Sequence, residues 1–195
     1  VGAQAGAPAE RARIRGEGNI APGPLAIGGE GALKAQEDHA RAVEVLARVR
    51  RRREACLVIL GGALDAAGLA ELGRTVSRAA ALGVSPDLRL PGFVDPVEPW
   101  YAAFDALLNV SRHEGLSMAT REALGAGLPV VAADVGGQGE TSHPRLHLLP
   151  AGATASDFAA RLAGLPVRVR LDPERAPRFP RAWSGAASWR PAAGP

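Results

Sequence analysis

The chain has 195 residues, of which 47% are hydrophobic and 22% charged, and its formal net charge is +3 at pH 7. This length suits about one domain with appended segments, and the composition is typical of a folded globular protein rather than a disordered or fibrous one. The single cysteine excludes a disulfide framework and a cysteine-rich metal site, and the four histidines lack a metal-like pairing such as HExxH.

The two ends of the chain differ in composition from its middle. Residues 1–22 are rich in Ala, Gly, Pro and charged residues without apolar periodicity, so we expect a poorly ordered N-terminal segment. Residues 166–195 are predicted to form a Pro/Arg-rich tail of the same kind. Between them, residues 23–165 are predicted to form one domain.

Within this domain, short apolar segments alternate with amphipathic ones. We expect strands at residues 24–28, 56–62, 88–94, 105–111, 129–134 and 146–150. We expect helices at residues 36–50, 66–82, 98–103, 117–126 and 156–163. Continuous apolar strands separated by helices are typical of a parallel sheet covered on both faces, so the predicted fold is α/β and Rossmann-like. Ligands of such sheets bind at the carboxyl ends of the strands.

The start of the fourth predicted helix has the features of an anion site. Glu114 and Gly115 lie just before the apolar-periodic segment. We therefore expect the backbone N–H groups of Gly115, Leu116 and Ser117 to point out of the helix start. The positive end of the helix dipole suits a diphosphate, and Gly115 leaves the backbone open to a ligand.

A second carboxylate, Glu122, follows Glu114 by eight residues, which is about two helical turns. It can therefore flank the same cleft, and a carboxylate accepts two sugar hydroxyls at once. Gly127 and Pro129 are expected to end this helix. Two glutamates at this spacing are also common on exposed helix surfaces, so the pair alone leaves that interpretation open.

The sequence around the pair is similar to the Glu-x7-Glu region of glycosyltransferase family four, also called group 1, which contains retaining enzymes of the GT-B fold. The positions in register are Ser111, Glu114, Gly115, Glu122, Ala123, Gly127, Pro129, Val130, Val131, Asp134, Gly136 and Gly137. Upstream, Gly92, Phe93, Tyr101 and Asp105 match a second segment of the family. The chain thus resembles the C-terminal, donor-binding domain of such an enzyme, a single GT-B half.

The resemblance implies a role for several of these residues. Glu114 is implied to be the catalytic residue that contacts hydroxyls of the donor sugar, and Glu122 to bind the ribose of the nucleotide. The backbone near Phe93 and Val94 is implied to hold the base, and Lys34 to contact the diphosphate. A solvated lysine at a helix start is an equally good interpretation of Lys34.

Two further features lie near the expected site. The resemblance places Gly136 and Gly137 in a loop near the donor, while a turn that needs positive φ explains them almost as well. Family members usually carry an Arg in G-R-L-x-x-x-K, and this chain has Gly29 at that position, followed by Glu30. Loss of a charge-assisted hydrogen bond of about 1.5–3 kcal/mol would weaken donor affinity by about one to two powers of ten.

The predicted function is therefore transfer of a sugar from a nucleoside diphosphate sugar to an acceptor, with retained configuration. The resemblance implies an N-terminal acceptor domain that is missing here or supplied by a partner, so we expect the chain alone to be inactive. No metal or other cofactor is expected. The alternative is a degenerate, non-catalytic nucleotide-binding or interaction module, which the missing Arg and the missing half favour. A sugar-nucleotide epimerase of similar architecture fits the Glu-x7-Glu region less well.

Two classes of partner are not expected. The basic run at residues 48–54 is better explained as the solvated end of a helix than as a nucleic-acid patch. No apolar run approaches the roughly 20 residues of a transmembrane segment. We therefore expect a cytoplasmic protein, either free or attached peripherally to a membrane.

Overall fold

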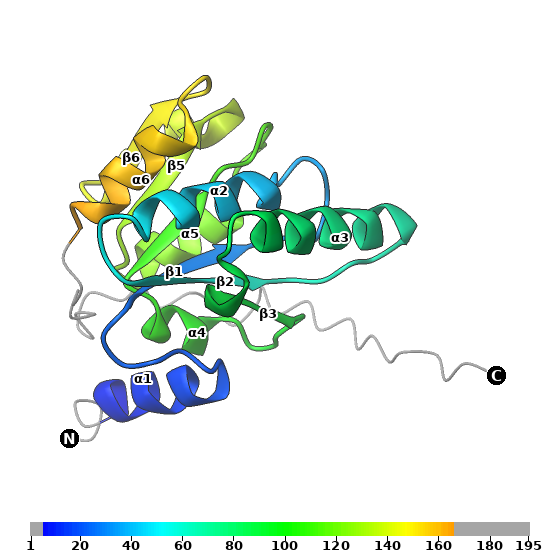
Figure 1. Ribbon diagram of the computed structural model, residues 1–195. Helices are drawn as coiled ribbons and strands as arrows, with labels where there is room; N and C mark the ends of the chain where they lie inside the picture. The colour runs from blue at the N-terminus through cyan, green and yellow to red at the C-terminus, as the bar shows by residue number, and fades with distance from the viewer. Residues whose placement is uncertain (1–5, 166–195) are drawn as a thin grey trace.

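The computed structural model describes residues 6–165, and the predicted tail at residues 166–195 lies outside the described residues. Six parallel strands form one sheet in the order β3-β2-β1-β4-β5-β6 (Figure 1). The strands are β1 (Leu25–Glu30), β2 (Ala55–Leu60), β3 (Leu88–Gly92), β4 (Ala106–Asn109), β5 (Val130–Asp134) and β6 (Leu146–Pro150). The predicted parallel α/β sheet is confirmed.

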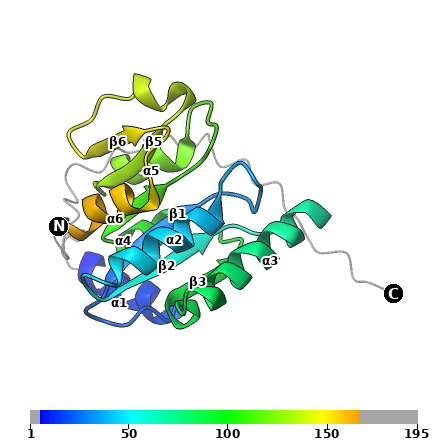
Figure 2. The same ribbon diagram turned by 45° about the horizontal axis from the view of Figure 1, so that its top comes forward.

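Helices cover both faces of this sheet (Figures 1 and 2). The α-helices are α1 (Gly6–Glu17), α2 (His39–Val49), α3 (Ala66–Ala81), α4 (Glu98–Ala103), α5 (Met118–Gly125) and α6 (Ala155–Ala163). Two short 3-10 helices, η1 (Ser85–Asp87) and η2 (Gly136–Glu140), lie in the connections. Helices α2, α3 and α6 contribute to one apolar cluster, and α1, α4 and α5 to the other.

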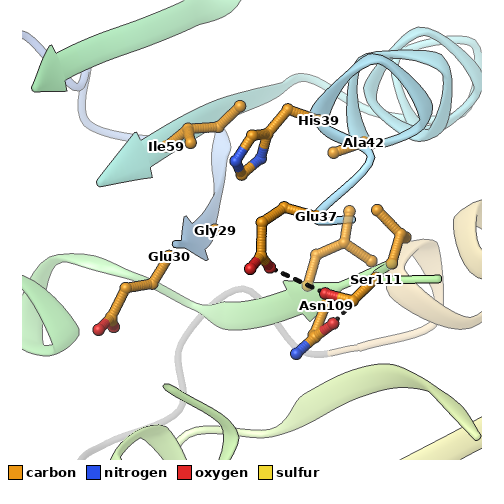
Figure 3. Close-up of a pocket in the computed structure, with 10 residues that line it drawn as sticks. Gly29, Glu30, Glu37, His39, Ala42, Ile59, Asn109 and Ser111 are labelled. Carbon is orange, nitrogen blue, oxygen red and sulfur yellow. Dashed lines mark hydrogen bonds between the residues drawn. The ribbon is translucent and has the colours of Figure 1, made fainter. Parts of the chain in front are cut away.

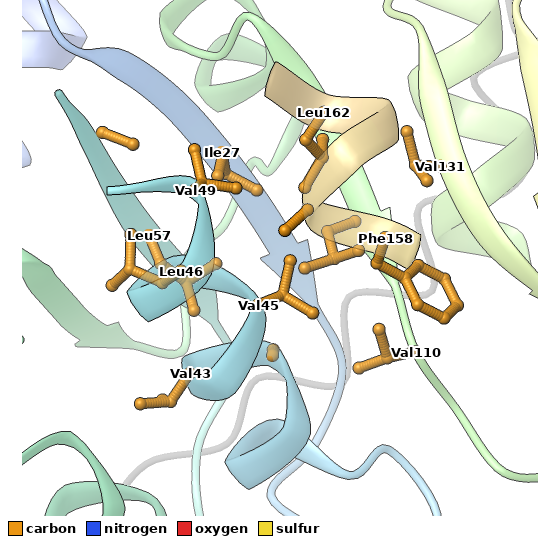
Figure 4. Close-up of a cluster of buried hydrophobic side chains, with 14 of the residues drawn as sticks. Ile27, Val43, Val45, Leu46, Val49, Leu57, Val110, Val131, Phe158 and Leu162 are labelled. Atoms are coloured by element: carbon orange, nitrogen blue, oxygen red, sulfur yellow. The ribbon is translucent and has the colours of Figure 1, made fainter. Parts of the chain in front are cut away.

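The two clusters explain why the central strands are apolar throughout. In β1, Leu25 and Ile27 point into the first cluster and Ala26 into the second, and each is fully buried. Figure 4 shows the first cluster, to which β1 contributes Ile27, α2 contributes Leu46 and α6 contributes Phe158. Because both faces are covered by helices, a strand has no solvent side on which polar residues would be favoured.

The prediction of a poorly ordered segment at residues 1–22 is wrong for residues 6–17, which form α1. Two arginines of this helix reach Asp105, which is fully buried: Arg11 Nη2 lies 2.6 Å and Arg15 Nη1 3.7 Å from its carboxylate oxygens. Ile14 adds its side chain to the second apolar cluster. The helix is therefore attached largely by charged groups, and it lacks the apolar stripe that would reveal it in the sequence.

Two other boundaries differ from the predicted ones. The helix expected from residue 36 begins only at His39, and residues 36–38 lie in the loop after β1. The segment after β5, expected to be a loop, contains η2. The end of α5 is as predicted, since Gly127 has a φ of +81° directly after the C-cap Ala126.

The strand order places β1 beside β4 at the centre of the sheet. The chain leaves β1 for α2 on one face and leaves β4 for α5 on the other face. The two connections therefore separate above the carboxyl ends of β1 and β4, and open α/β sheets bind their ligands at such a crevice.

Candidate functional site

A small pocket of about 10 Å³ marks this crevice, with room for about one water molecule. Its lining, shown in Figure 3, comes from β1, β2, β4, the start of α2 and the loops that follow β1 and β4: Gly29, Glu30, Glu37, His39, Ala42, Ile59, Leu108, Asn109, Val110 and Ser111. The pocket is too small for a nucleotide, so a ligand of that size would lie over its mouth and against the loops around it.

The loops after β1 and β4 are joined across the crevice by hydrogen bonds. Ser111 Oγ donates to Glu37 Oε2 over 2.9 Å, and Gln36 Nε2 donates to the carbonyl oxygen of His113 over 2.8 Å. Burial raises the pKa of Glu37, while the bond from Ser111 and the nearby charge of Lys34 act in the opposite direction. These contacts hold the two loops as one unit.

Asn109, the last residue of β4, fixes the loop that carries the first predicted glutamate. Its amide nitrogen Nδ2 donates to Glu114 Oε1 and to Ser117 Oγ, each over 3.1 Å. Its side-chain oxygen Oδ1 accepts from the backbone amide of Ser111 over 3.0 Å. Glu114 is half-buried, and within the described residues only one of its carboxylate oxygens is hydrogen-bonded, so the other is available to a ligand.

The start of α5 is open. The helix begins at Met118 with Ser117 as its N-cap, and Ser117 Oγ accepts from the amide of Thr120 over 3.3 Å. Gly115 and Leu116 are exposed, and a Cβ added at Gly115 would meet no atom of residues 6–165 within 4 Å. In the part of the chain that the structure describes, the amides of Gly115, Leu116 and Ser117 donate no hydrogen bond. The hydroxyl of buried Ser117 caps the helix. Ser117 can therefore contribute only its backbone amide to the predicted anion site.

Gly136 and Gly137 pack directly against this loop. Gly136 has a φ of +57°, and a Cβ on it would lie 1.6 Å from the carbonyl oxygen of Glu114. The amide of Gly137 donates to the carbonyl of Gly115 over 2.8 Å. The interpretation as a turn fits Gly136, whose φ is positive. Both glycines also lie against the loop in which the anion site is predicted.

Glu122 is linked to Glu30 at the end of β1 through Tyr101 of α4. The Tyr101 hydroxyl lies 3.0 Å from Glu122 Oε2 and is also hydrogen-bonded to Glu30 Oε2 at the end of β1. Burial raises the pKa of Glu30 to about 7, the bond from Tyr101 opposes this, and the charges of Glu122 and Glu98 add to it. Burial and the two carboxylates also raise the pKa of Tyr101.

The remaining predicted residues lie around the same edge of the sheet. Lys34 is exposed in the loop after β1 and is close enough to Glu37 to lower its pKa. Phe93, after β3, is 57% exposed, and its ring occupies the space beside Gly62. Val94 is half-buried and packs against the second apolar cluster, which leaves its backbone for a ligand.

Four polar residues of the crevice were not identified from the sequence as site residues: Glu30, Glu37, Tyr101 and Asn109. Glu30 and Asn109 carry a usable signal, since each is the polar residue that closes an otherwise apolar strand. The other two lie in a loop and on a short helix, and nothing in their local sequence indicates that they meet Ser111 or Glu122.

Residues 6–165 contain no candidate metal site and no candidate membrane-spanning helix. The side chains of His, Cys, Asp and Glu form no group of three or more that could hold a metal ion there. None of the helices that the structure describes is both long and apolar enough to cross a bilayer.

Comparison with known proteins identifies the family. Residues 26–165 match the family described as Glycosyl transferases group 1. The D-inositol 3-phosphate glycosyltransferase 2 of Catenulispora acidiphila is 36% identical over 130 residues, which cover 64% of this chain and 30% of the relative. The D-inositol 3-phosphate glycosyltransferase of Nocardia farcinica is 32% identical over 81% of this chain and 36% of its own length. The chain thus spans about a third of the length of these curated relatives.

Solved structures agree on the fold. HepE of Anabaena, solved in complex with UDP-glucose, superposes with a TM-score of 0.71 at 21% identity and covers 80% of this chain and 42% of its own. The C-terminal domain of a group 1 family protein, LpcC, from Francisella tularensis superposes with a TM-score of 0.67 at 19% identity, over 78% of this chain and 80% of its own. The chain belongs to the group 1 glycosyltransferases and has the Rossmann-like fold of the C-terminal half of a GT-B enzyme.

Proposed function

We propose that this chain is the donor-binding domain of a retaining glycosyltransferase and that it binds a nucleoside diphosphate sugar over the crevice at the ends of β1 and β4. The observation that carries the proposal is the open start of α5. There the amides of Gly115 and Leu116, which donate no hydrogen bond within the described residues, follow Glu114 directly, and Glu122 lies farther along the helix. Such a helix start is a general anion-binding site.

Each group then has a role in binding the donor. The diphosphate lies at the amides of α5 and near Lys34, where the helix dipole and the ammonium group oppose its charge. Glu114 accepts from hydroxyls of the sugar and acts as the catalytic residue, and Glu122 accepts from the ribose. The backbone at Phe93 and Val94 holds the base. No metal is needed, because the amides stabilise the charge that develops on the leaving diphosphate.

The acceptor is proposed to bind to a second domain. The relatives are about three times as long as the matched segment, which supports a further part that supplies the acceptor side. HepE, which has the same fold, was solved with UDP and UDP-glucose, and this supports a nucleotide sugar as the ligand. We expect the complete protein to act in the cytoplasm.

Calorimetric titration of the chain with UDP, GDP and ADP tests the donor site. We expect micromolar binding of one of them and a loss of at least tenfold in affinity in Glu122→Ala, about the value of one lost hydrogen bond to a charged group. The matched control is Glu54→Ala. Glu54 is an exposed glutamate just before β2, at the amino end of that strand and away from the crevice. Absence of heat with all three nucleotides, or equal effects of the two substitutions, would contradict the proposal.

Gly29 favours a second candidate, a module of the same fold that has lost donor binding. Group 1 members usually have an arginine at this position, and here the next residue is the acidic Glu30. A Cβ at Gly29 would meet nothing closer than 3.6 Å, so packing at the Cβ position does not require the glycine. If the native chain binds no nucleotide and Gly29→Arg binds one with micromolar affinity, the second candidate is correct. If both bind, with the variant about ten to a hundred times tighter, the donor site is functional.

A further inference from the structure

Tyr101 lies between two carboxyl groups and cannot donate to both. Its hydroxyl is hydrogen-bonded to Glu30 Oε2 and lies 3.0 Å from Glu122 Oε2. A phenol has one hydrogen to donate. For both contacts to be hydrogen bonds, one of the two carboxyl groups must carry a proton and donate it to the phenol oxygen.

The surroundings of Glu30 decide which carboxyl carries that proton. Tyr101 and Glu98 face it from α4 and Glu122 from α5. Glu30 also lines the pocket together with Glu37 and His39. Burial lowers the pKa of His39. In the part of the chain that the structure describes, neither Glu30 nor Glu122 forms a salt bridge. Both carboxyl groups are half-buried, but Glu30 has two acidic neighbours, Glu122 and Glu98, and this crowding of negative charge favours the neutral form at Glu30.

We propose that protonated Glu30 is a positioning residue for the donor nucleotide: it donates to the Tyr101 oxygen, so that the Tyr101 hydroxyl donates to Glu122 and holds that carboxylate toward the ribose. The proposal deepens the proposed function and rests on it, because it assumes that Glu122 accepts from the ribose. Loss of the proton from Glu30 turns the Tyr101 hydroxyl toward Glu30. Glu122 then loses its donor and faces a second negative charge across the phenol.

Nucleotide binding should therefore depend on pH in a defined direction. The raised pKa of Glu30, about 7, places its titration between pH 6 and 8. Below this range Glu30 is neutral and Glu122 is held by Tyr101. Above it the arrangement is lost, so we expect the affinity for the nucleotide to fall about tenfold as pH rises from 6 to 8, roughly the value of one hydrogen bond to a charged group.

The test is a titration with the nucleotide that binds best among UDP, GDP and ADP, at pH 5.5, 6.5, 7.5 and 8.5. In Glu30→Gln the amide donates to Tyr101 at every pH, so we expect a flat profile at the affinity that the native chain has at low pH. In Tyr101→Phe we expect a flat profile at weak affinity. Glu54 is an exposed glutamate at the amino end of β2, so Glu54→Gln should keep the pH dependence of affinity that the native chain shows.

Flat binding by the native chain, or a native slope in Glu30→Gln, overturns this inference and leaves the proposed function intact. Absence of binding at every pH contradicts the proposed function instead. In that case carbon-13 NMR of the free chain with labelled glutamate still decides the arrangement around Tyr101. We expect the Glu30 carboxyl to titrate near neutral pH and its pKa to fall in Glu122→Gln. Titration of Glu30 in the ordinary acidic range overturns the inference.

Discussion

Replacement of Asp105 by alanine should strongly destabilise the protein. Its carboxylate is fully buried and accepts from Arg11 Nη2 over 2.6 Å and from the amide of Ala26 over 2.9 Å, with Arg15 Nη1 at 3.7 Å. Asp105→Ala leaves the guanidinium groups without their counter-charge and the amide without an acceptor. Removal of one partner of a buried ion pair costs about 3–5 kcal/mol, and we expect a loss of that size in the free energy of unfolding.

Urea unfolding followed by circular dichroism measures this loss, with Arg13→Ala as the matched control in the same helix. The Arg13 side chain is 51% exposed and, among residues 6–165, pairs only with Glu10 and Glu17 of α1, so its removal should have a much smaller effect. Asp105→Asn keeps an acceptor for the amide of Ala26 and should fall between the two. If Asp105→Ala destabilises no more than Arg13→Ala, the attachment of α1 through buried charge is refuted.

Three further substitutions test other parts of the structure. The pKa of Glu30 is raised from 4.5 to about 7, so its contribution to stability is fully present below pH 4.5 and is lost as pH rises through 7. Urea unfolding should therefore show Glu30→Gln to be more stable than the native chain by about 3 kcal/mol at pH 8 and not at pH 4.5, and equal differences at both values would exclude this cause. Gly136→Ala forces a Cβ toward the carbonyl of Glu114 and should weaken nucleotide binding at least tenfold in calorimetry, whereas Gly152→Ala, whose Cβ would meet nothing within 4 Å, should bind as the native chain does. Gly73→Ala in α3 also meets nothing within 4 Å and should stabilise by about 0.5–1 kcal/mol, seen as a higher thermal midpoint; a lower midpoint would contradict the open environment of Gly73.

The fold could be predicted from the sequence because burial on both faces makes each central strand a continuous apolar run. Segments such as CLVIL are recognisable without any knowledge of their neighbours. Helix α1 could not be predicted in the same way. Its attachment depends on Arg11 and on Asp105, which lie 94 residues apart, and only the folded chain brings them together.

The candidate site also contains residues that local sequence predicts and contacts that it does not predict. The residues at the start of α5 could be found because they are contiguous and the family pattern names them, and their roles as ligands stay predictions. The contact of Glu30, Tyr101 and Glu122 could not be found, because it joins β1, α4 and α5 and depends on the strand order that places β1 beside β4. Local sequence holds no information on such a meeting of distant elements.

The hydrogen bonds between the loops after β1 and β4 limit how this domain can be engineered. Gln36 and Glu37 belong to one loop, and His113 and Ser111, their partners, belong to the other. A graft that exchanges one loop for that of another group 1 glycosyltransferase would break both contacts and misplace the recipient's remaining loop. Loop grafts in this fold should therefore transplant the two segments as a pair.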